Sequence, residues 1–212
     1  VATDQALWQN SDDPRYQQML IEANRGMSQV ITGHQIPVIS GKDSMYNQVA
    51  KYDADGNLVE TGVYPTLFMI TFAKIDDVDD IVTIDAKKEG DLIYIIGSTT
   101  KADMGGSEYT HMLSEKTGTE FNVGQVSDED IGEVYDTFTR MNQATQQHLL
   151  QSSNYVAEGG LVTAIKETAM AGERGIELDI DKVHQETRLN LYETMYGETE
   201  GRFVVTVKRG DQ

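Results

Sequence analysis

The sequence has no cysteine, so disulfide bonds, thiolate metal sites and cysteine nucleophiles are excluded. It also has no apolar run near the roughly 20 residues that a membrane-spanning helix needs, so we expect no membrane partner. The N-terminal residues Val1–Gln5 contain no basic segment followed by an apolar core, and therefore show no signal peptide. We expect a cytoplasmic protein.

Positive charge is scarce as well. The 212 residues include 17 lysines and arginines against 35 aspartates and glutamates, which gives a net charge of -18 at pH 7. A field of this sign repels phosphate backbones, so we expect no nucleic-acid partner. Anionic small molecules would need local help from lysine, helix N-termini or a divalent cation. A solubility surface is the simpler explanation of the total charge.

What the sequence does contain is a concentrated polar stretch directly after an apolar segment. Ile36–Ile39 is predicted to be a short strand, and Ser40–Ser44 a tight turn at its end. Open α/β sheets usually bind ligands at the ends of their strands. Gly41 would let a ligand come close to the backbone, and Lys42 could contact a phosphate group. A Walker-type loop is excluded, because the glycine five residues before Gly41 and the hydroxyl directly after Lys42 are absent. A solvated turn remains the alternative.

The first half of the chain is predicted to mix one long helix with strands. Asp13 and Pro14 are typical of a helix start, and apolar residues at helical spacing follow until Gly33. The expected elements are a helix over Pro14–Gly33, a hairpin over Gln48–Tyr52 and Leu58–Val63, and a strand over Thr66–Ala73.

The second half is predicted to be a separate domain. Charge and glycine replace the apolar pattern near residues 84–90, so we place the domains at 1–85 and 86–212. The expected elements are strands over Asp91–Ile96, Ile176–Ile180 and Phe203–Val207, and helices over Asp128–Gln151 (capped by Ser127), Leu161–Ala171 and Leu189–Tyr196. Strands and helices mix without strict alternation, which favours an α+β fold over a Rossmann-type sheet.

Most familiar catalytic motifs are absent. The four histidines share no metal-ligand spacing, and the sequence has no Gly-x-Ser-x-Gly motif. Four Gly- or Ser-rich turns remain at the ends of predicted elements, at 40–44, 105–108, 158–160 and 197–202. Such turns around one cleft would suit a phosphorylated substrate and a magnesium nucleotide, although ordinary connections need the same residues.

The order of these turns resembles one protein family. The motifs are Pro37–Asn47 (PVISGKDSMYN), Gly105–Tyr109 (GGSEY), Ala157–Leu161 (AEGGL) and Glu198–Phe203 (ETEGRF). This series is similar to phosphoribosylformylglycinamidine synthase (FGAM synthase), the amidotransferase of purine synthesis, and the similarity spans nearly the whole chain. It covers most of the second of two tandem synthetase-like halves. The resemblance therefore implies part of an aminoimidazole-ribonucleotide-synthetase-like N-terminal domain, followed by the matching α/β sandwich C-terminal domain.

The resemblance also implies an activity. Members of this family are ATP-dependent amidoligases that use glutamine as nitrogen donor and convert formylglycinamide ribonucleotide to formylglycinamidine ribonucleotide, with ATP and Mg²⁺ as cofactors. The chain would be a fragment that is inactive alone, with the first synthetase-like half and a glutaminase as partners. Two alternatives stay open: a non-catalytic half that acts as a scaffold or binds a structural nucleotide, and another ATP-dependent synthetase of the same superfamily.

Three residues match binding positions of the family. Asp4 and Gly41 match positions that contact ATP in the smaller forms of the enzyme, and Ser44 matches a serine that contacts the substrate. Lys42 stands where the smaller forms have a magnesium-binding asparagine, and resembles the larger forms instead. No catalytic residue and no metal ligand is assigned to this chain.

Two residues of the second half depart from the family pattern. Tyr155 and Ala157 stand where larger forms carry an aspartate and a serine at an auxiliary nucleotide site. Neither a phenol nor a methyl group readily replaces a carboxylate that binds a metal or a hydroxyl that donates a hydrogen bond.

Overall fold

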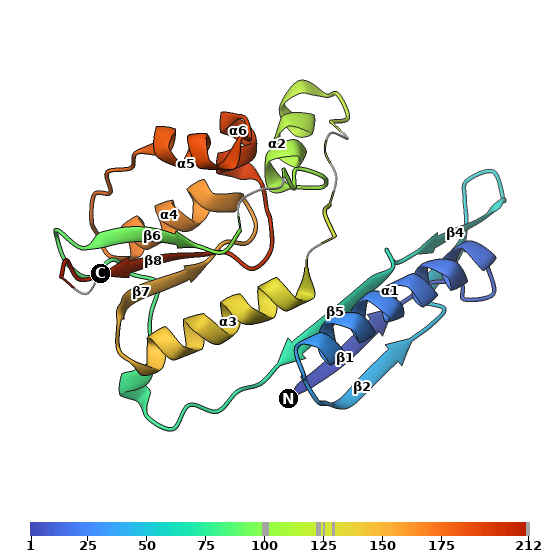
Figure 1. The fold of residues 1–212 in the computed structure, drawn as a ribbon. Helices are drawn as coiled ribbons and strands as arrows, with labels where there is room; N and C mark the ends of the chain where they lie inside the picture. The colour runs from blue at the N-terminus through green and yellow to red at the C-terminus, as the bar shows by residue number, and fades with distance from the viewer. Residues whose placement is uncertain (99–101, 122–123, 125, 129, 211–212) are drawn as a thin grey trace. The chain divides into compact units, whose positions relative to one another are not determined.

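The computed structural model describes residues 1–98, 102–121, 124, 126–128 and 130–210. The chain forms two compact units, Val1–Lys74 and Ile75–Gln212 (Figure 1). Both contain small sheets and helices, which confirms the predicted α+β class. The domain boundary expected after residue 85 lies inside the second unit. It stays a prediction, because the border between two compact units need not coincide with the border between two domains of a family. No helix in the described part of the chain is long and apolar enough to cross a membrane.

Unit 1 (Val1–Lys74) is built on a three-stranded sheet in the order β2-β1-β5. Strand β1 (Ala2–Leu7) runs parallel to β2 (Val38–Ser44) and antiparallel to β5 (Thr66–Thr71). Helix α1 (Pro14–Gly33) connects β1 to β2 and lies along one face of the sheet (Figure 1). The unit is thus a small sheet with a helical cover.

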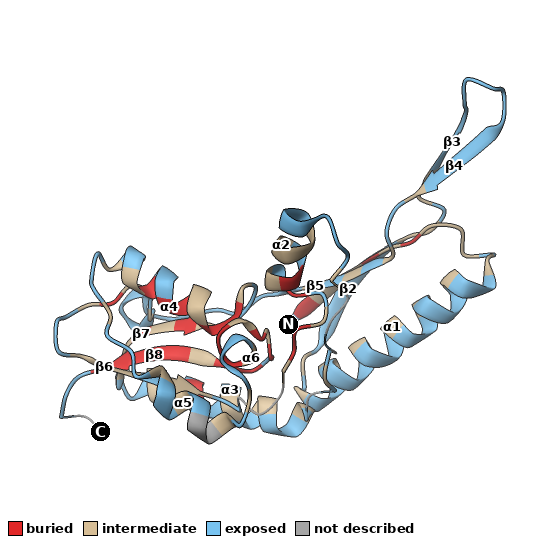
Figure 2. Cartoon of the chain, turned by 90° about the horizontal axis from the view of Figure 1, so that it is seen from above, coloured by how far each residue is buried: buried red, intermediate tan, exposed pale blue. Residues whose placement is uncertain are grey.

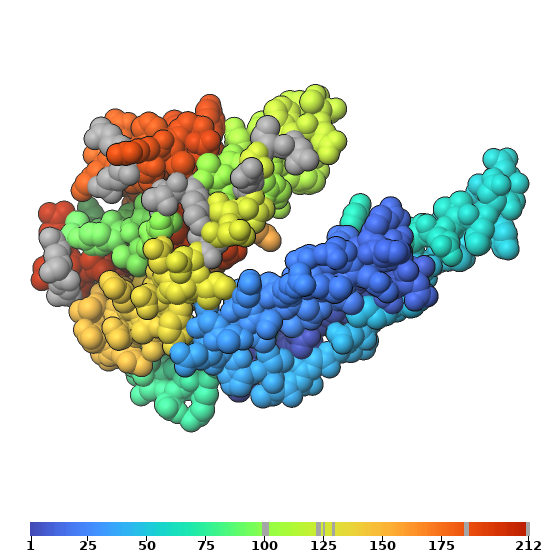
Figure 3. Space-filling model, turned by 45° about the vertical axis from the view of Figure 1, so that its right-hand side comes forward, coloured from blue at the N-terminus to red at the C-terminus, as the bar shows by residue number. Residues whose placement is uncertain are grey.

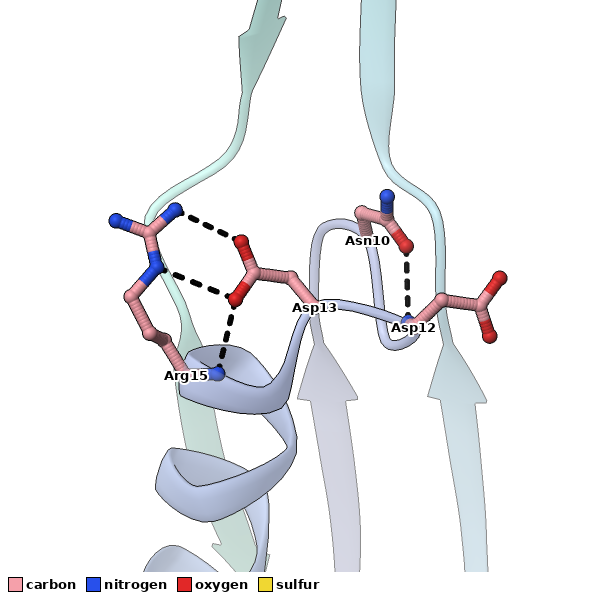
Figure 4. Close-up of polar contacts among 4 residues, drawn as sticks. All are labelled: Asn10, Asp12, Asp13 and Arg15. Atoms are coloured by element: carbon pink, nitrogen blue, oxygen red, sulfur yellow. Dashed lines mark hydrogen bonds and ion pairs between the residues drawn. The ribbon is translucent and has the colours of Figure 1, made fainter.

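The start of α1 is fixed by Asp13 and Pro14, as the sequence predicts (Figure 4). Asp13 Oδ1 accepts hydrogen bonds from the backbone N and the Nε of Arg15 at 2.9 and 3.2 Å, and Oδ2 accepts one from Nη2 at 2.7 Å. Pro14 opens the first turn, where a missing N–H costs nothing. The half-buried face of the helix repeats at helical spacing, through Tyr16, Leu20, Ala23, Met27 and Ile31.

Alternate residues at the start of the chain meet this helix. Ala2, Ala6 and Trp8 are buried, and the indole Nε1 of Trp8 donates a hydrogen bond to the backbone O of Tyr16 at 2.8 Å. Because successive side chains of a strand point to opposite faces, Asp4 shares the helix-covered face with the two alanines.

Strands β3 (Gln48–Tyr52) and β4 (Leu58–Gly62) form the predicted hairpin. Asp53 closes its turn, because its Oδ1 accepts hydrogen bonds from the backbone N of Asp55 and Asn57 at 2.9 and 2.8 Å. Figure 3 shows the hairpin as a narrow arm of unit 1.

The predicted turn at Ser40–Ser44 is wrong, because these residues belong to β2. Their backbone pairs in register with Thr3–Leu7 of β1. Sequence reasoning had no strand at the start of the chain, so it had no partner to hold Ser40–Ser44 extended. The polar composition and the glycine of this segment then indicated a turn. In the structure the backbone hydrogen bonds to β1 make the segment a strand.

Unit 2 (Ile75–Gln212) is built on the antiparallel sheet β6-β8-β7, with helices around it. Its strands are β6 (Leu92–Ile96), β7 (Leu150–Tyr155) and β8 (Phe203–Val207). Its helices are η1 (Val78–Asp80, a 3-10 turn), α2 (Glu108–Thr117), α3 (Ile131–Gln146), α4 (Gly160–Ala171), α5 (Ile180–Thr187) and α6 (Leu191–Tyr196).

Helices α3 and α4 cover opposite faces of this sheet. Phe138 of α3 stacks on Tyr155 and meets Phe203 edge-on, with ring centroids 6.1 and 5.5 Å apart. On the other face, Val204 packs into a cluster with Leu161 of α4. Tyr155 and Phe203 are register partners, whereas Val204 is the next residue along β8 and points the other way. The result is a layered α/β arrangement.

The core of unit 2 lies under α4. Leu161, Ala164 and Ile165 pack there with Val156, Met195 and Val204, all less than a tenth exposed. Figure 2 shows buried residues concentrated in β7, β8 and α4, whereas α1 and the β3–β4 hairpin of unit 1 are mainly exposed. Unit 2 therefore holds the larger share of the buried apolar surface.

The long helix predicted over Asp128–Gln151 is wrong at both ends. The helix begins at Ile131 with Asp130 as its cap, and position 129 lies outside the described residues. It ends before His148, which has a left-handed φ of 54°, and Leu150–Tyr155 pairs with β8 instead. Leu149 and Leu150 fit a helical pattern and a strand equally well, and pairing with β8 makes Leu150 the start of a strand.

The strand predicted over Ile176–Ile180 is also wrong. Residues 176–179 have no ladder, and α5 begins at Ile180 because the Asp179 carboxylate accepts a hydrogen bond from the backbone N of Lys182 at 3.4 Å. Ile176 and Ile180 still pack against the core cluster, so their apolar character marks burial and not strand pairing.

We predict that Leu161→Ala lowers the free energy of unfolding by about 2–5 kcal/mol, because the side chain is 2% exposed and its removal leaves a cavity. Met170→Ala is the matched control on the same helix, since Met170 is 66% exposed and its truncation should cost little. Urea unfolding followed by circular dichroism measures both. Equal decreases in the free energy of unfolding for the two variants would contradict the assignment of Leu161 to the core.

Candidate functional site

Asp4 and Gly41 lie directly opposite each other on the parallel strands β1 and β2. The Asp4 carboxylate occupies the space beside Gly41: a Cβ atom on Gly41 would lie 2.2 Å from Asp4 Oδ1. Glycine at this position is therefore needed to leave the carboxylate where it is. The structure thus brings together the two residues expected to contact nucleotide, Asp4 on the central strand and Gly41 on the neighbouring strand. We name them the Asp4–Gly41 pair.

Ser44 and Lys42 lie on the other face of the same strand. The Lys42 Nζ donates a hydrogen bond to Ser44 Oγ, as expected for residues two apart on a strand. Gly41 directly precedes Lys42 on the strand and therefore points to the opposite face. The hydroxyl expected to contact substrate and the Asp4–Gly41 pair are thus on opposite faces of β2. Ser44 is half-buried at the strand end, where it pairs with Leu7 of β1.

The described residues offer only part of a binding site for Mg²⁺. They contain no group of three histidine or acidic side chains that could hold a metal by themselves. Mg²⁺ bound with a nucleotide needs only one or two carboxylates, since phosphates and water complete its shell. In unit 1 the Asp4 carboxylate, held beside Gly41, fits that limited requirement.

Three of the four predicted turns meet in unit 2 at the carboxylate of Glu198. Its Oε1 accepts hydrogen bonds from the backbone N of Glu108 at 2.9 Å and from that of Gly159 at 2.8 Å. The turn 105–108 leads into α2, the turn 158–160 leads into α4, and 197–202 carries Glu198 itself. The remaining turn, 40–44, belongs to unit 1.

Arg202 holds the 197–202 loop from inside. It is fully buried, and its Nε and Nη2 donate hydrogen bonds to the backbone O of Thr199 and Gly197 at 3.0 and 2.6 Å. Sequence reasoning singled out the loop but gave no role to Arg202 or Glu198. The available signal was a charged residue directly before an apolar strand, which is unusual unless its charge is satisfied within the fold.

Tyr155 is engaged in the fold through its hydroxyl and its ring. The hydroxyl accepts a hydrogen bond from the backbone N of Gly201 at 2.9 Å and donates one to the Glu200 carboxylate. Its ring packs between Phe138 and Phe203. Burial, and then the bond to Glu200, raise the pKa of this hydroxyl above its ordinary value of 10.0.

The end of β7 consequently does not fit a metal–nucleotide site. A neutral phenol that already has two partners is a poor ligand for Mg²⁺, and Ala157 offers no oxygen. The neighbouring Asn154 amide is turned inward, where its Nδ2 donates to the backbone O of Ala164 at 3.0 Å. The departures seen in the sequence are therefore built into the packing.

A cleft of about 1650 Å³ opens elsewhere in unit 2, beside β6. Ile93, Leu161 and Lys182 are among the residues that line it. None of the predicted site residues lines this cleft, so its size alone does not identify the functional site.

The family comparison agrees with this architecture. Residues 88–212, more than half of the chain, match the model of the AIR synthase related protein, C-terminal domain. The chain belongs to the AIR synthase related family.

Solved structures show the same fold over almost the whole chain. PurL of Thermotoga maritima complexed with FGAR is similar with a TM-score of 0.65 and 18% identity, over 99% of this chain and 31% of that one. The same protein complexed with AMPPCP gives 0.60 and 16%, over 99% and 29%. HypE of E. coli, a hydrogenase maturation protein, gives 0.51 and 12%, over 98% and 58%. The chain thus spans about a third of the length of PurL, and these identities establish the fold alone.

We predict that Tyr155→Phe lowers the free energy of unfolding by about 1–2 kcal/mol, because Gly201 N and the Glu200 carboxylate each lose a partner. Tyr94→Phe on β6 is the control: Tyr94 is 40% exposed, and the loss of its hydroxyl should change stability little. Denaturant unfolding compares the two. A loss for Tyr94→Phe as large as that for Tyr155→Phe would contradict the assigned role.

Alkaline pH should weaken the fold through the same residue. The pKa of Tyr155 is raised in the folded state, so above pH 10.0 the unfolded chain loses this proton first. The stabilisation is complete below that pH and is lost as pH rises toward the folded-state value. The unfolding free energy should therefore fall more steeply above pH 10 in the wild type than in Tyr155→Phe. Parallel pH profiles for the two proteins would rule this out.

Proposed function

We propose that this chain is part of an FGAM synthase, an ATP-dependent amidoligase that converts formylglycinamide ribonucleotide to the amidine with nitrogen from glutamine. The observation that carries the proposal is the Asp4–Gly41 pair: the glycine of the SGKDSMYN motif lies opposite a carboxylate whose position leaves no room for a Cβ there. Family membership and the PurL-like fold over 99% of the chain support it.

Each residue would have a separate task. The absence of a Cβ at Gly41 leaves the half-buried Asp4 carboxylate in place beside β2, where it would hold a magnesium nucleotide. When bound, Mg²⁺ would supply positive charge beside the phosphates, which would offset the repulsion expected from the net charge of -18. Ser44, hydrogen-bonded to Lys42 on the opposite face of β2, would contact the ribonucleotide substrate.

The complete enzyme would have parts that this chain does not contain. It would use ATP to activate the amide oxygen of the substrate, and ammonia from glutamine would then displace phosphate. The first synthetase-like half and a glutaminase domain or subunit are the proposed partners, and the cytoplasm is the proposed location. The 31% of PurL that the chain spans is compatible with such a division.

Another ATP-dependent synthetase of the superfamily is the second candidate. The similarity to HypE, over 58% of that protein, is the reason to retain it, because the shared fold alone does not choose between the two. The two functions are distinguished by measuring which substrate stimulates ATP hydrolysis by the complete enzyme. Hydrolysis that depends on formylglycinamide ribonucleotide supports the first function. Hydrolysis driven by a different substrate supports the second.

The nucleotide assignment is tested by calorimetric titration of the chain with Mg·ATP. We expect saturable binding that is lost in Asp4→Asn and in Gly41→Ala, because the added methyl group forces the carboxylate away. Asp55→Asn, in the turn of the β3–β4 hairpin, removes the same charge elsewhere in unit 1 and should bind normally. Equal binding by all four proteins would overturn the assignment.

The substrate assignment is tested by Ser44→Ala in the complete enzyme. A lost hydroxyl contact to substrate should lower kcat/KM by roughly ten- to a hundredfold, equivalent to about 1.4–2.7 kcal/mol. Thr66→Ala, at the start of β5, is the control for loss of a strand hydroxyl. Unchanged kinetics together with lower thermal stability would assign Ser44 to the scaffold.

A further inference from the structure

Glu198 bridges the beginnings of two helices that lie far apart in the sequence. One carboxylate oxygen accepts hydrogen bonds from Glu108 N, in the first turn of α2, and from Gly159 N, at the cap of α4. Backbone N–H groups at such positions have no partner within their helix and carry partial positive charge. Ser107 caps α2 through Thr110 N, whereas Gly159 has no side chain to cap α4. Glu198 therefore supplies the anion at both helix starts.

The loop that carries Glu198 is fixed on both sides of this contact. The backbone N of Glu198 donates a hydrogen bond to Asp103 O at 2.9 Å, and the buried Arg202 holds the carbonyl groups of Gly197 and Thr199. Gly160 approaches so closely that a Cβ there would lie 2.7 Å from Gly197 O. The carboxylate is consequently placed by the fold and not by a flexible side chain at the surface.

Glu200, the other carboxylate of this loop, is exposed but also has a partner within the fold. It accepts the hydrogen bond of Tyr155, while the Tyr155 hydroxyl accepts that of Gly201 N. The 197–202 loop thus binds the start of α2, the start of α4 and the end of β7 with its own side chains. A phosphate at the two helix starts would have to displace the Glu198 carboxylate, which is already bound there.

We propose that Glu198 is the internal anion of unit 2: it assembles the three glycine-rich turns and excludes phosphate groups from the starts of α2 and α4. The proposal deepens the proposed function, because it leaves the Asp4–Gly41 pair of unit 1 as the place for nucleotide phosphates. It also gives the glycine-rich turns of unit 2 a task other than binding nucleotide. They permit the close approach of three backbone segments around one carboxylate.

The test uses inorganic phosphate and the amide resonances of Glu108 and Gly159. In the wild type these resonances should not move on titration with phosphate, because Glu198 occupies both N–H groups. In Glu198→Ala they should move saturably, since two donors are released and a negative charge is removed. Glu158→Ala is the matched control, because it removes the same charge beside Gly159 but leaves the Glu198 contacts in place.

A second variant keeps the test decisive if Glu198→Ala does not fold. Glu198→Gln retains an acceptor oxygen but loses the charge, so it should fold and show a phosphate-dependent shift smaller than that of the alanine variant. Phosphate shifts at Glu108 and Gly159 in the wild type would overturn the proposal, as would the absence of shifts in both folded variants. These outcomes do not depend on unit 1, so a failure of Mg·ATP to bind there would be recognised separately.

Discussion

Backbone N–H groups at the ends of helices must find a partner, and this requirement shapes unit 2. Glu198 meets it for α2 and α4 with a single oxygen, at 2.9 and 2.8 Å. The buried guanidinium of Arg202 meets the matching requirement for the carbonyl groups of the loop. Both charged side chains thus have backbone partners, and they hold the loop between α6 and β8 in place.

In unit 1 the corresponding constraint is the fit between a carboxylate and a missing side chain. The parallel pairing of β1 with β2 places Asp4 opposite Gly41, and the space that a Cβ would fill is taken by the carboxylate. Helix α1 covers this face, and Trp8 joins the sheet to its first turn. The two units therefore use glycine differently. In unit 1 it leaves room for a charged group at the sheet, whereas in unit 2 it lets backbones meet.

The sequence was informative wherever local chemistry decides the structure. Asp13 and Pro14 predicted the start of α1, and the alternation of Phe203–Val207 predicted β8. Prediction from the sequence failed where the structure of a segment depends on a strand that is distant in the sequence. Ser40–Ser44 is polar and contains glycine, yet it is a strand because β1 pairs with it. Leu149 and Leu150 continue a helical pattern, yet the chain leaves the helix for β7 because β8 offers a ladder.

The candidate site shows the same division. Motif order identified the glycine-rich turns and the resemblance to FGAM synthase, and the AIR synthase related family and fold are confirmed. The roles of Glu198 and Arg202 could not be predicted, because each depends on contacts with backbone groups that only the folded chain brings near. Tyr155 was recognised as a departure from the family pattern, but its bonds to Glu200 and Gly201 required the structure.

Hydrogen–deuterium exchange of the chain with and without Mg·ATP tests the central claim most directly. We predict slower exchange at the backbone amides of β1 and β2 around Asp4 and Gly41, with no change at Glu108 and Gly159. Slower exchange at Glu108 and Gly159, with β1 and β2 unchanged, would contradict it. The nucleotide would then be held by the helix starts that Glu198 is inferred to close.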